Sequence, residues 1–315
     1  MPTQRIDLLN TVLIVVSFLV ALFVPFHLFL FAYAVLGPLH YLTEIPWLHS
    51  HNYFTKKKTD GLVFLGVGVC LTILFFESAM NGSFGLSAML IVTCFLWSIV
   101  CLLTERNDVR IYAFIVIFIL ASFLVMLPTL LLLFGVLLPT LIHVYVFTLL
   151  FMLYGARKNN SMIGYGNVFL VCLCVGLFFM LQFESIAGVG SYVKESYLLS
   201  FGVLHETLGG FLGKPFESSE SFFSATLGIV LMQCIAFAYT YHYLNWFSKT
   251  GVIKWHERVW SHRYLILVLW IVALGLYAYS YIVGIAALYF LSMLHVLMEF
   301  PLNIHTIRAL GSRKS

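Results

Sequence analysis

Charged side chains are scarce in this sequence. Of its 315 residues only 10% are Asp, Glu, Lys or Arg, whereas 62% are hydrophobic. A soluble domain carries about 25% charged residues, so this composition excludes a soluble globular fold. The net charge of +4 is small, and most Lys and Arg residues lie between apolar runs, so we interpret it as a topology signal and expect no nucleic-acid partner.

Cysteine patterns typical of structural zinc sites are also missing. The six cysteines all lie within apolar runs, and none forms a C-x-x-C pair. We therefore interpret them as small buried hydrophobic residues. The first apolar run lacks a small-residue cleavage site, so we expect a retained membrane helix there and not a removed signal peptide.

Long apolar runs, in contrast, fill most of the chain. A membrane-spanning helix needs about 20 mostly apolar residues. The runs predict about ten such helices, over residues 8–24, 26–46, 61–79, 87–104, 111–128, 129–155, 165–184, 223–247, 264–281 and 284–303. We expect Pro25, Pro128 and Gly284 to mark tight turns between consecutive spans, and Pro38 and Pro139 to kink the spans that contain them.

The distribution of Lys and Arg predicts the orientation of these spans. Cytoplasmic loops collect basic residues, and a basic cluster follows every even-numbered span. These clusters are Lys56 to Lys58, Arg106 with Arg110, Arg157 with Lys158, Lys249 with Lys254, Arg258 and Arg263, and Arg308 with Arg313 and Lys314. The longest segment on the other side, 185–222, contains only two Lys residues. The sequence thus predicts one all-α membrane domain over 1–315 with both termini cytoplasmic, in a bacterial inner membrane, and an outer cap or interfacial segment at 185–222.

Ionisable residues inside the predicted spans are the candidates for function, because each costs about 2.5–3.5 kcal/mol at the bilayer centre. His40 and Glu44 are four residues apart in the second span, which places both on one helical face. His295 and Glu299 repeat this spacing in the last span.

Two single histidines complete the set. His143 and His242 lie in the sixth and eighth spans, so that all four histidines come from even-numbered spans and are expected in the inner half of one bundle. Ligands that project inward from facing helices are what a metal site in a helix bundle requires. Imidazole with carboxylate suits iron. We expect His40, His143, His242 and His295 to bind Fe(II).

The carboxylates and neighbouring aromatic residues have separate predicted roles. Glu44 and Glu299 would bind the metal or orient a histidine through its second nitrogen. Tyr241, next to His242, is an additional catalytic candidate. Aromatic residues that flank the ligands suit a long apolar substrate, although ordinary core packing explains each of them equally well. They are Tyr41, Tyr145, Tyr241, Tyr243 and Trp246. His49 and His51 are near enough to the inner end of their span to reach a site there, but we expect them, like His256 and His262, to be solvated loop residues.

The order of the histidine motifs resembles that of the Brp/Blh family of membrane β-carotene 15,15′-dioxygenases. His40-x-x-x-Glu44 is similar to the early Pro-His-Gly-x-x-Asp motif of the family, and His143 to its single histidine in a middle helix. The segment from Tyr241 through Phe247 is similar to its later His-rich motif, and Leu294-His295 with Glu299 to its last one.

The resemblance covers roughly residues 38–300 and includes three departures. Glu44 replaces Asp, Tyr41 replaces Gly, and Trp246 stands where the family has a second histidine. The resemblance implies an iron-dependent enzyme that uses O₂ to cleave a carotenoid to retinal-type aldehydes.

Three functions are therefore open on the sequence. The first is a membrane-embedded non-haem iron oxygenase, with O₂ as co-substrate and an apolar lipid or carotenoid as substrate. The second is a proton- or cation-coupled transporter that uses the intramembrane His and Glu residues. The third is an assembly protein whose polar residues only join helices. The sequence carries no signal for the oligomeric state.

Overall fold

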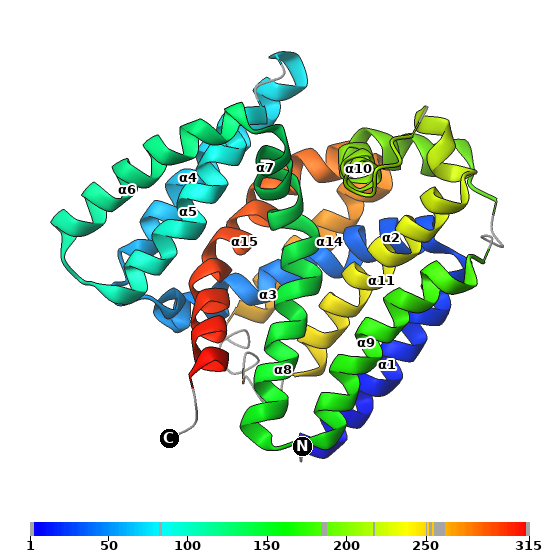
Figure 1. Ribbon diagram of the computed structural model, residues 1–315, viewed down its shortest axis with the longest axis horizontal. Coiled ribbons are helices and arrows are strands. Elements are labelled where there is room, and N and C mark those ends of the chain that lie inside the picture. Colours follow the sequence, from blue (N-terminus) through cyan, green and yellow to red (C-terminus); the bar gives the residue numbers. More distant parts are fainter. Residues whose placement is uncertain are drawn as a thin grey trace. The chain divides into compact units, whose positions relative to one another are not determined.

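The computed structural model describes residues 3–81, 84–183, 188–216, 218–249, 251, 254 and 262–312. Every regular element in these ranges is a helix, and the described part of the chain contains no β-strand (Figure 1). The predicted all-α class is therefore confirmed for this part of the chain. His256, Arg258, Arg313 and Lys314 lie outside the described residues.

Eight helices in the described ranges are long and apolar enough to cross a membrane. Single helices form five of them: α1 (Thr3–Phe23), α4 (Asp60–Asn81), α5 (Phe84–Leu103), α9 (Met162–Leu181) and α11 (Thr226–Ser248). The long α15 (Tyr281–Gly311) is the sixth. Two are composite, namely α2 (Pro25–Phe31), η1 (Ala32–Leu36) and α3 (Gly37–Ser50), and α7 (Pro128–Leu132), η4 (Leu133–Phe147) and α8 (Thr148–Asn159). Such a set is typical of an integral membrane protein.

The other two predicted spans correspond to shorter helices. Helix α6 (Asn107–Ser122) has 16 residues and α14 (Arg263–Tyr279) has 17. Both expose large apolar side chains, including Ile111 and Ile119 on α6 and Leu265 and Ile271 on α14. Apolar surface of this kind suits lipid contact and not water.

Two of the three predicted turns are confirmed. Pro25 and Pro128 stand at the first positions of α2 and α7, where a missing N–H costs no hydrogen bond. The turn predicted at Gly284 is wrong, because the break comes at Ser280 and α15 begins at Tyr281. Gly284 instead lets the ring of Tyr277 approach the helix so closely that a Cβ would overlap it.

The predicted irregularities at Pro38 and Pro139 coincide with π-helical turns. Pro139 lies inside η4, which is π-helical over 15 residues, and Pro38 follows directly after η1 and Gly37. Proline removes a backbone donor and collides with the carbonyl four residues earlier, so a wider turn relieves the clash. π-Bulges are frequent at functional sites.

The described helices form two compact units, and the chain passes between them within three continuous helices. These passages fall between His40 and Tyr41 in α3, after His143 in η4, and after Ala287 in α15; two more flank a short segment that ends at His262 and is assigned to the second unit. Nothing in the sequence marks the three positions that fall inside regular helices. The predicted cap, 185–222, contains α10 (Ser191–Phe211) and η5 (Ser219–Phe223).

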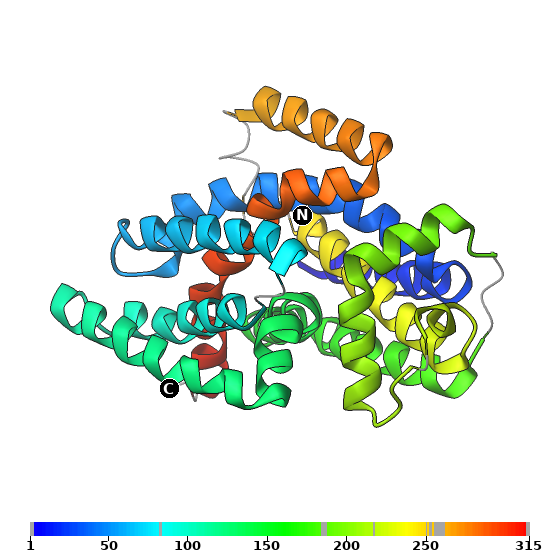
Figure 2. The same ribbon diagram turned by 90° about the horizontal axis from the view of Figure 1, so that it is seen from above.

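The first unit is built on α1, α9 and α11, which lie side by side (Figures 1 and 2). Phe178 of α9 packs between Phe18 of α1 and Phe237 of α11, with ring centroids 4.7 and 6.0 Å away. Asn10 of α1 donates a hydrogen bond to Ser248 of α11 at 3.1 Å. This packing holds α11, the helix that carries His242.

The second unit contains α4, α5 and α6 as neighbours (Figure 1). A buried ion pair joins Asp60 at the start of α4 to Arg110 of α6, with 2.5 Å between Nη1 and Oδ1. Arg110 also donates to the carbonyl oxygens of Cys101 and Thr104 at the end of α5. One guanidinium therefore ties three helices together.

Candidate metal centre

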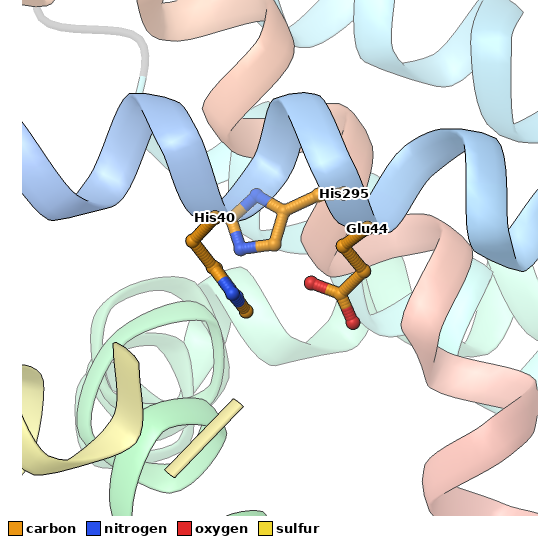
Figure 3. Close-up of side chains that lie close together, drawn as sticks. All are labelled: His40, Glu44 and His295. Atoms are coloured by element: carbon orange, nitrogen blue, oxygen red, sulfur yellow. The ribbon is translucent and has the colours of Figure 1, made fainter. Parts of the chain in front are cut away.

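Helix α3 supplies the first pair of candidate ligands. His40 and Glu44 are one turn apart on the same face, and both are buried, with 0% and 1% of their surface exposed. Figure 3 shows the two side chains leaving the same side of α3. The separation of four residues therefore places His40 and Glu44 on one helical face, as predicted from the sequence.

Helix α15 brings His295 to this pair. One ligand atom each from His40, Glu44 and His295 can be chosen so that all three lie within 4.8 Å of one another (Figure 3). Ligand atoms that share one ion are typically about 3–4 Å apart, given metal–ligand bonds of about 2.0–2.2 Å. Small side-chain adjustments would therefore let these three groups share an ion.

A second carboxylate lies one turn further along α15. Glu299 is 2% exposed, and its Oε2 is 3.3 Å from Nδ1 of His143, which is contributed by η4. The ring of His143 also packs edge-on against that of His295, with centroids 5.2 Å apart. His143, Glu299 and His295 are therefore neighbours, as the sequence predicted.

His242 reaches the cluster through His40. The Nε2 atoms of the two rings are 3.2 Å apart, and Nδ1 of His242 is 2.8 Å from the hydroxyl of Thr148. In a pair of neutral imidazoles one nitrogen must donate and the other accept. Thr148 thus helps to fix which way His242 is turned, as an outer hydrogen-bonding partner does for a metal ligand.

The chemistry of the donor set fits a divalent transition metal. All six predicted groups are buried, and they consist of four imidazoles and two carboxyls. Glu44 and Glu299 are 1% and 2% exposed, so neither carboxyl is solvated by water. A bound cation offsets the cost of burying two carboxylates together, and imidazole with carboxylate is a donor set that iron accepts.

Aromatic rings line the histidines on α3 and α11. Trp246 packs edge-on against His40 with ring centroids 5.4 Å apart. The ring of Tyr243 is 5.3 Å from that of His40, and the ring of Tyr41 is 5.8 Å from that of His295. The histidines of the cluster therefore have aromatic neighbours.

Tyr241 has a different environment from the other predicted site residues. Its hydroxyl donates to Oδ1 of Asn10 on α1 at 3.2 Å and contacts the sulfur of Met152 at 3.4 Å. Successive residues of a helix point about 100° apart, so Tyr241 and His242 face different neighbours. The catalytic role predicted for Tyr241 receives no support from these contacts, and we leave it out of the site.

Asn303 is a buried polar residue of α15 that was not among the site residues predicted from the sequence. This residue follows Glu299 by one turn on α15, is 1% exposed, and has no hydrogen-bond partner for either amide atom within the described part of the chain. The signal was present in the sequence, because His295, Glu299 and Asn303 continue one i, i+4 series. Asn303 extends the buried polar stripe of α15 by a further turn.

Three of the four histidines predicted to be solvated loop residues are described by the structure. His49 and His51 are exposed; their Nδ1 atoms lie 2.6 Å from the hydroxyl of Tyr53 and 2.9 Å from the carbonyl of Trp47. His262 is exposed as well. The predicted exposure is therefore observed for all three, but His49 lies in the last turn of α3 and not in a loop.

No family model, no curated protein and no solved structure matches this chain. The resemblance to the Brp/Blh family therefore stays a prediction, which rests on the order of the four motifs along the chain.

Proposed function

We propose that this chain is a membrane-embedded non-haem iron oxygenase that acts on a long apolar substrate. The observation that carries the proposal is the group formed by His40, Glu44 and His295, whose ligand atoms lie within 4.8 Å of one another among apolar helices. A buried set of imidazole and carboxylate donors is expensive to maintain in a membrane protein unless it has a use.

Each residue of the cluster has a proposed task. His40, Glu44 and His295 would hold the iron, with His143 and Glu299 beside them. His242, held by Thr148, would orient His40. Iron, when bound, supplies the redox chemistry that allows O₂ to react with a hydrocarbon. The burial of every one of these side chains would keep water from the reacting groups.

The substrate class follows from the surroundings and from the resemblance. Tyr41, Tyr243 and Trp246 present flat apolar surfaces beside the histidines. Such surfaces suit a conjugated chain, which would enter from the bilayer. The motifs similar to the Brp/Blh family make a carotenoid, cleaved to retinal-type aldehydes, the first substrate to test.

We also propose the finer topology predicted from the charges. In this arrangement α6 and α14 complete ten spans, and both termini lie on the cytoplasmic side of a bacterial inner membrane. The basic cluster after every even-numbered predicted span supports this orientation.

Metal analysis of detergent-purified protein tests the oxygenase proposal. We expect bound iron in the wild type and in His51→Ala, a control that changes an exposed histidine, and loss of iron in His40→Ala and His295→Ala. Incubation of the iron-loaded wild type with carotenoids under oxygen should then yield aldehydes detectable by chromatography. Wild-type protein that binds no iron after anaerobic loading would refute the proposal.

The second candidate is a proton- or cation-coupled transporter. The observation in its favour is the π-helical stretch Leu133–Phe147, because interrupted helices are typical of transporter binding sites. The buried polar stripe that continues to Asn303 is compatible with it. Proton or cation flux in proteoliposomes, without stoichiometric bound metal, would favour this function over the oxygenase.

A further inference from the structure

The ligand arrangement differs between the two ends of the cluster. At one end His40, Glu44 and His295 converge. At the other end His143 faces Glu299, at 3.3 Å between Nδ1 and Oε2. Glu44 therefore lies near His40 and His295, whereas Glu299 lies near His143. A site for a single ion would not require a separate imidazole beside each carboxylate.

The two helices α3 and α15 each contribute one histidine and one glutamate at the same spacing. His40 and Glu44, and likewise His295 and Glu299, share a face of their helix. Di-metal centres in helical bundles are built in a similar way, from His and Glu residues repeated on facing helices. Repetition of the motif thus supplies enough donors for two ions.

Asn303 provides an independent indication at the second end. It follows Glu299 by one turn and is almost fully buried, with its amide oxygen and nitrogen unpaired within the described residues. A buried amide without a hydrogen bond costs free energy unless something else satisfies it. An amide oxygen is an acceptable ligand for a metal, directly or through a water molecule.

We propose that the cluster holds two metal ions, the first bound by His40, Glu44 and His295 and the second by His143, Glu299 and Asn303. Each ion in this arrangement has one buried carboxylate, Glu44 for the first and Glu299 for the second. Two divalent cations offset the repulsion between two buried carboxylates more completely than one does. Paired ions of this kind lie about 3.5–4 Å apart in known sites.

This inference shares one assumption with the proposed function, namely that the cluster binds metal. Its test is a titration of chelator-treated, detergent-purified protein with Mn²⁺ under argon, followed by electron paramagnetic resonance. Counting the bound ions per chain requires no substrate and no turnover. Two Mn²⁺ ions at short distance also give a spin-coupled spectrum that an isolated ion does not.

We expect two bound Mn²⁺ ions and a coupled spectrum in the wild type. His143→Gln and Asn303→Leu should bind one ion with an uncoupled spectrum. Thr306→Val is the matched control, because Thr306 is another buried polar residue of α15 but its hydroxyl bonds the carbonyl of Leu302; it should keep both ions.

The possible outcomes separate this inference from the proposed function. One ion per chain in the wild type, unchanged in His143→Gln and Asn303→Leu, would overturn the second ion and leave the oxygenase proposal standing. No bound ion in the wild type would overturn both. Because the wild type alone distinguishes two ions from one, misfolding of a variant does not remove the test.

Discussion

Buried histidines in this chain have two kinds of neighbour. His40 and His242 face each other and lie near further ionisable groups, whereas His205 of α10 lies among aromatic rings. The ring of His205 stacks on Phe222 with centroids 4.5 Å apart, and its Nδ1 lies 2.9 Å from the hydroxyl of Tyr197. Burial lowers the pKa of His205 from 6.5 to about 4, and a backbone interaction with Gly228 partly opposes the shift.

The lowered pKa of His205 predicts an acid-sensitive stability. Protonation is easier in the unfolded chain, so the stabilising effect of the neutral ring is complete above about pH 6.5 and is lost as the pH falls toward 4. Thermal unfolding in detergent between pH 7 and pH 4.5 should show a steeper fall in Tm for the wild type than for His205→Gln. Parallel curves for the two proteins would show that His205 does not titrate on unfolding.

At the scale of elements, packing in the second unit depends on one buried ion pair. Arg110 lies in the first turn of α6, is 4% exposed, and binds Asp60 of α4 together with the carbonyl groups of Cys101 in α5 and Thr104 just after it. A guanidinium at the C-terminal end of a helix, as here at the end of α5, also interacts favourably with the dipole of that helix. The sequence assigned Arg110 to a basic cytoplasmic cluster, and only the structure gives it this second role.

Removal of the negative partner tests that role. Asp60→Asn leaves the guanidinium of Arg110 buried without its counter-charge, which typically costs about 3–5 kcal/mol of stability. Asp108→Asn is the control, because Asp108 pairs with Arg106 at the surface and solvent screens that pair. We expect a large fall in Tm for the first variant and almost none for the second. Equal effects would show that the buried pair does not hold these helices.

The cluster of His and Glu residues is a property of several elements together. Each of α3 and α15 contributes a His–Glu pair that is visible in the sequence, because a separation of four residues fixes a common face. Contact between His40 and His242 joins residues 202 positions apart, and no local rule predicts it. The π-helical turns of η4 also change which face of the helix carries His143.

For the molecule as a whole, the exposed surface is consistent with a lipid environment. Large apolar side chains are exposed along the spans, for example Leu62 on α4 and Phe169 on α9, at 67% and 69%. Water would make such surfaces aggregate. The apolar helices therefore establish the membrane character, whereas orientation depends on the basic loops.

Labelling of an introduced cysteine tests the proposed orientation. Lys58 and Glu195 are both exposed outside the long apolar helices, in segments proposed to lie on opposite sides. An impermeant thiol reagent should label Glu195→Cys in intact spheroplasts and Lys58→Cys only after permeabilisation. The wild type, whose six cysteines lie within apolar runs, measures the background. Labelling in the reverse order would invert the topology.

The sequence by itself determined the helical membrane class, the approximate span positions and the two His–Glu pairs. Run length, proline positions and four-residue spacing act within one helix and need no knowledge of its neighbours. Even there, Gly284 was misread as a turn, because a glycine is also used where a ring packs closely, as Tyr277 does.

Tertiary structure alone decided which predicted residues meet. It turned His242 toward His40 and Tyr241 toward Asn10, placed His143 against Glu299, and buried Asn303 one turn after Glu299 on α15. These outcomes depend on how helices distant in sequence rotate and pack against one another, and that rotation is set by many side chains at once.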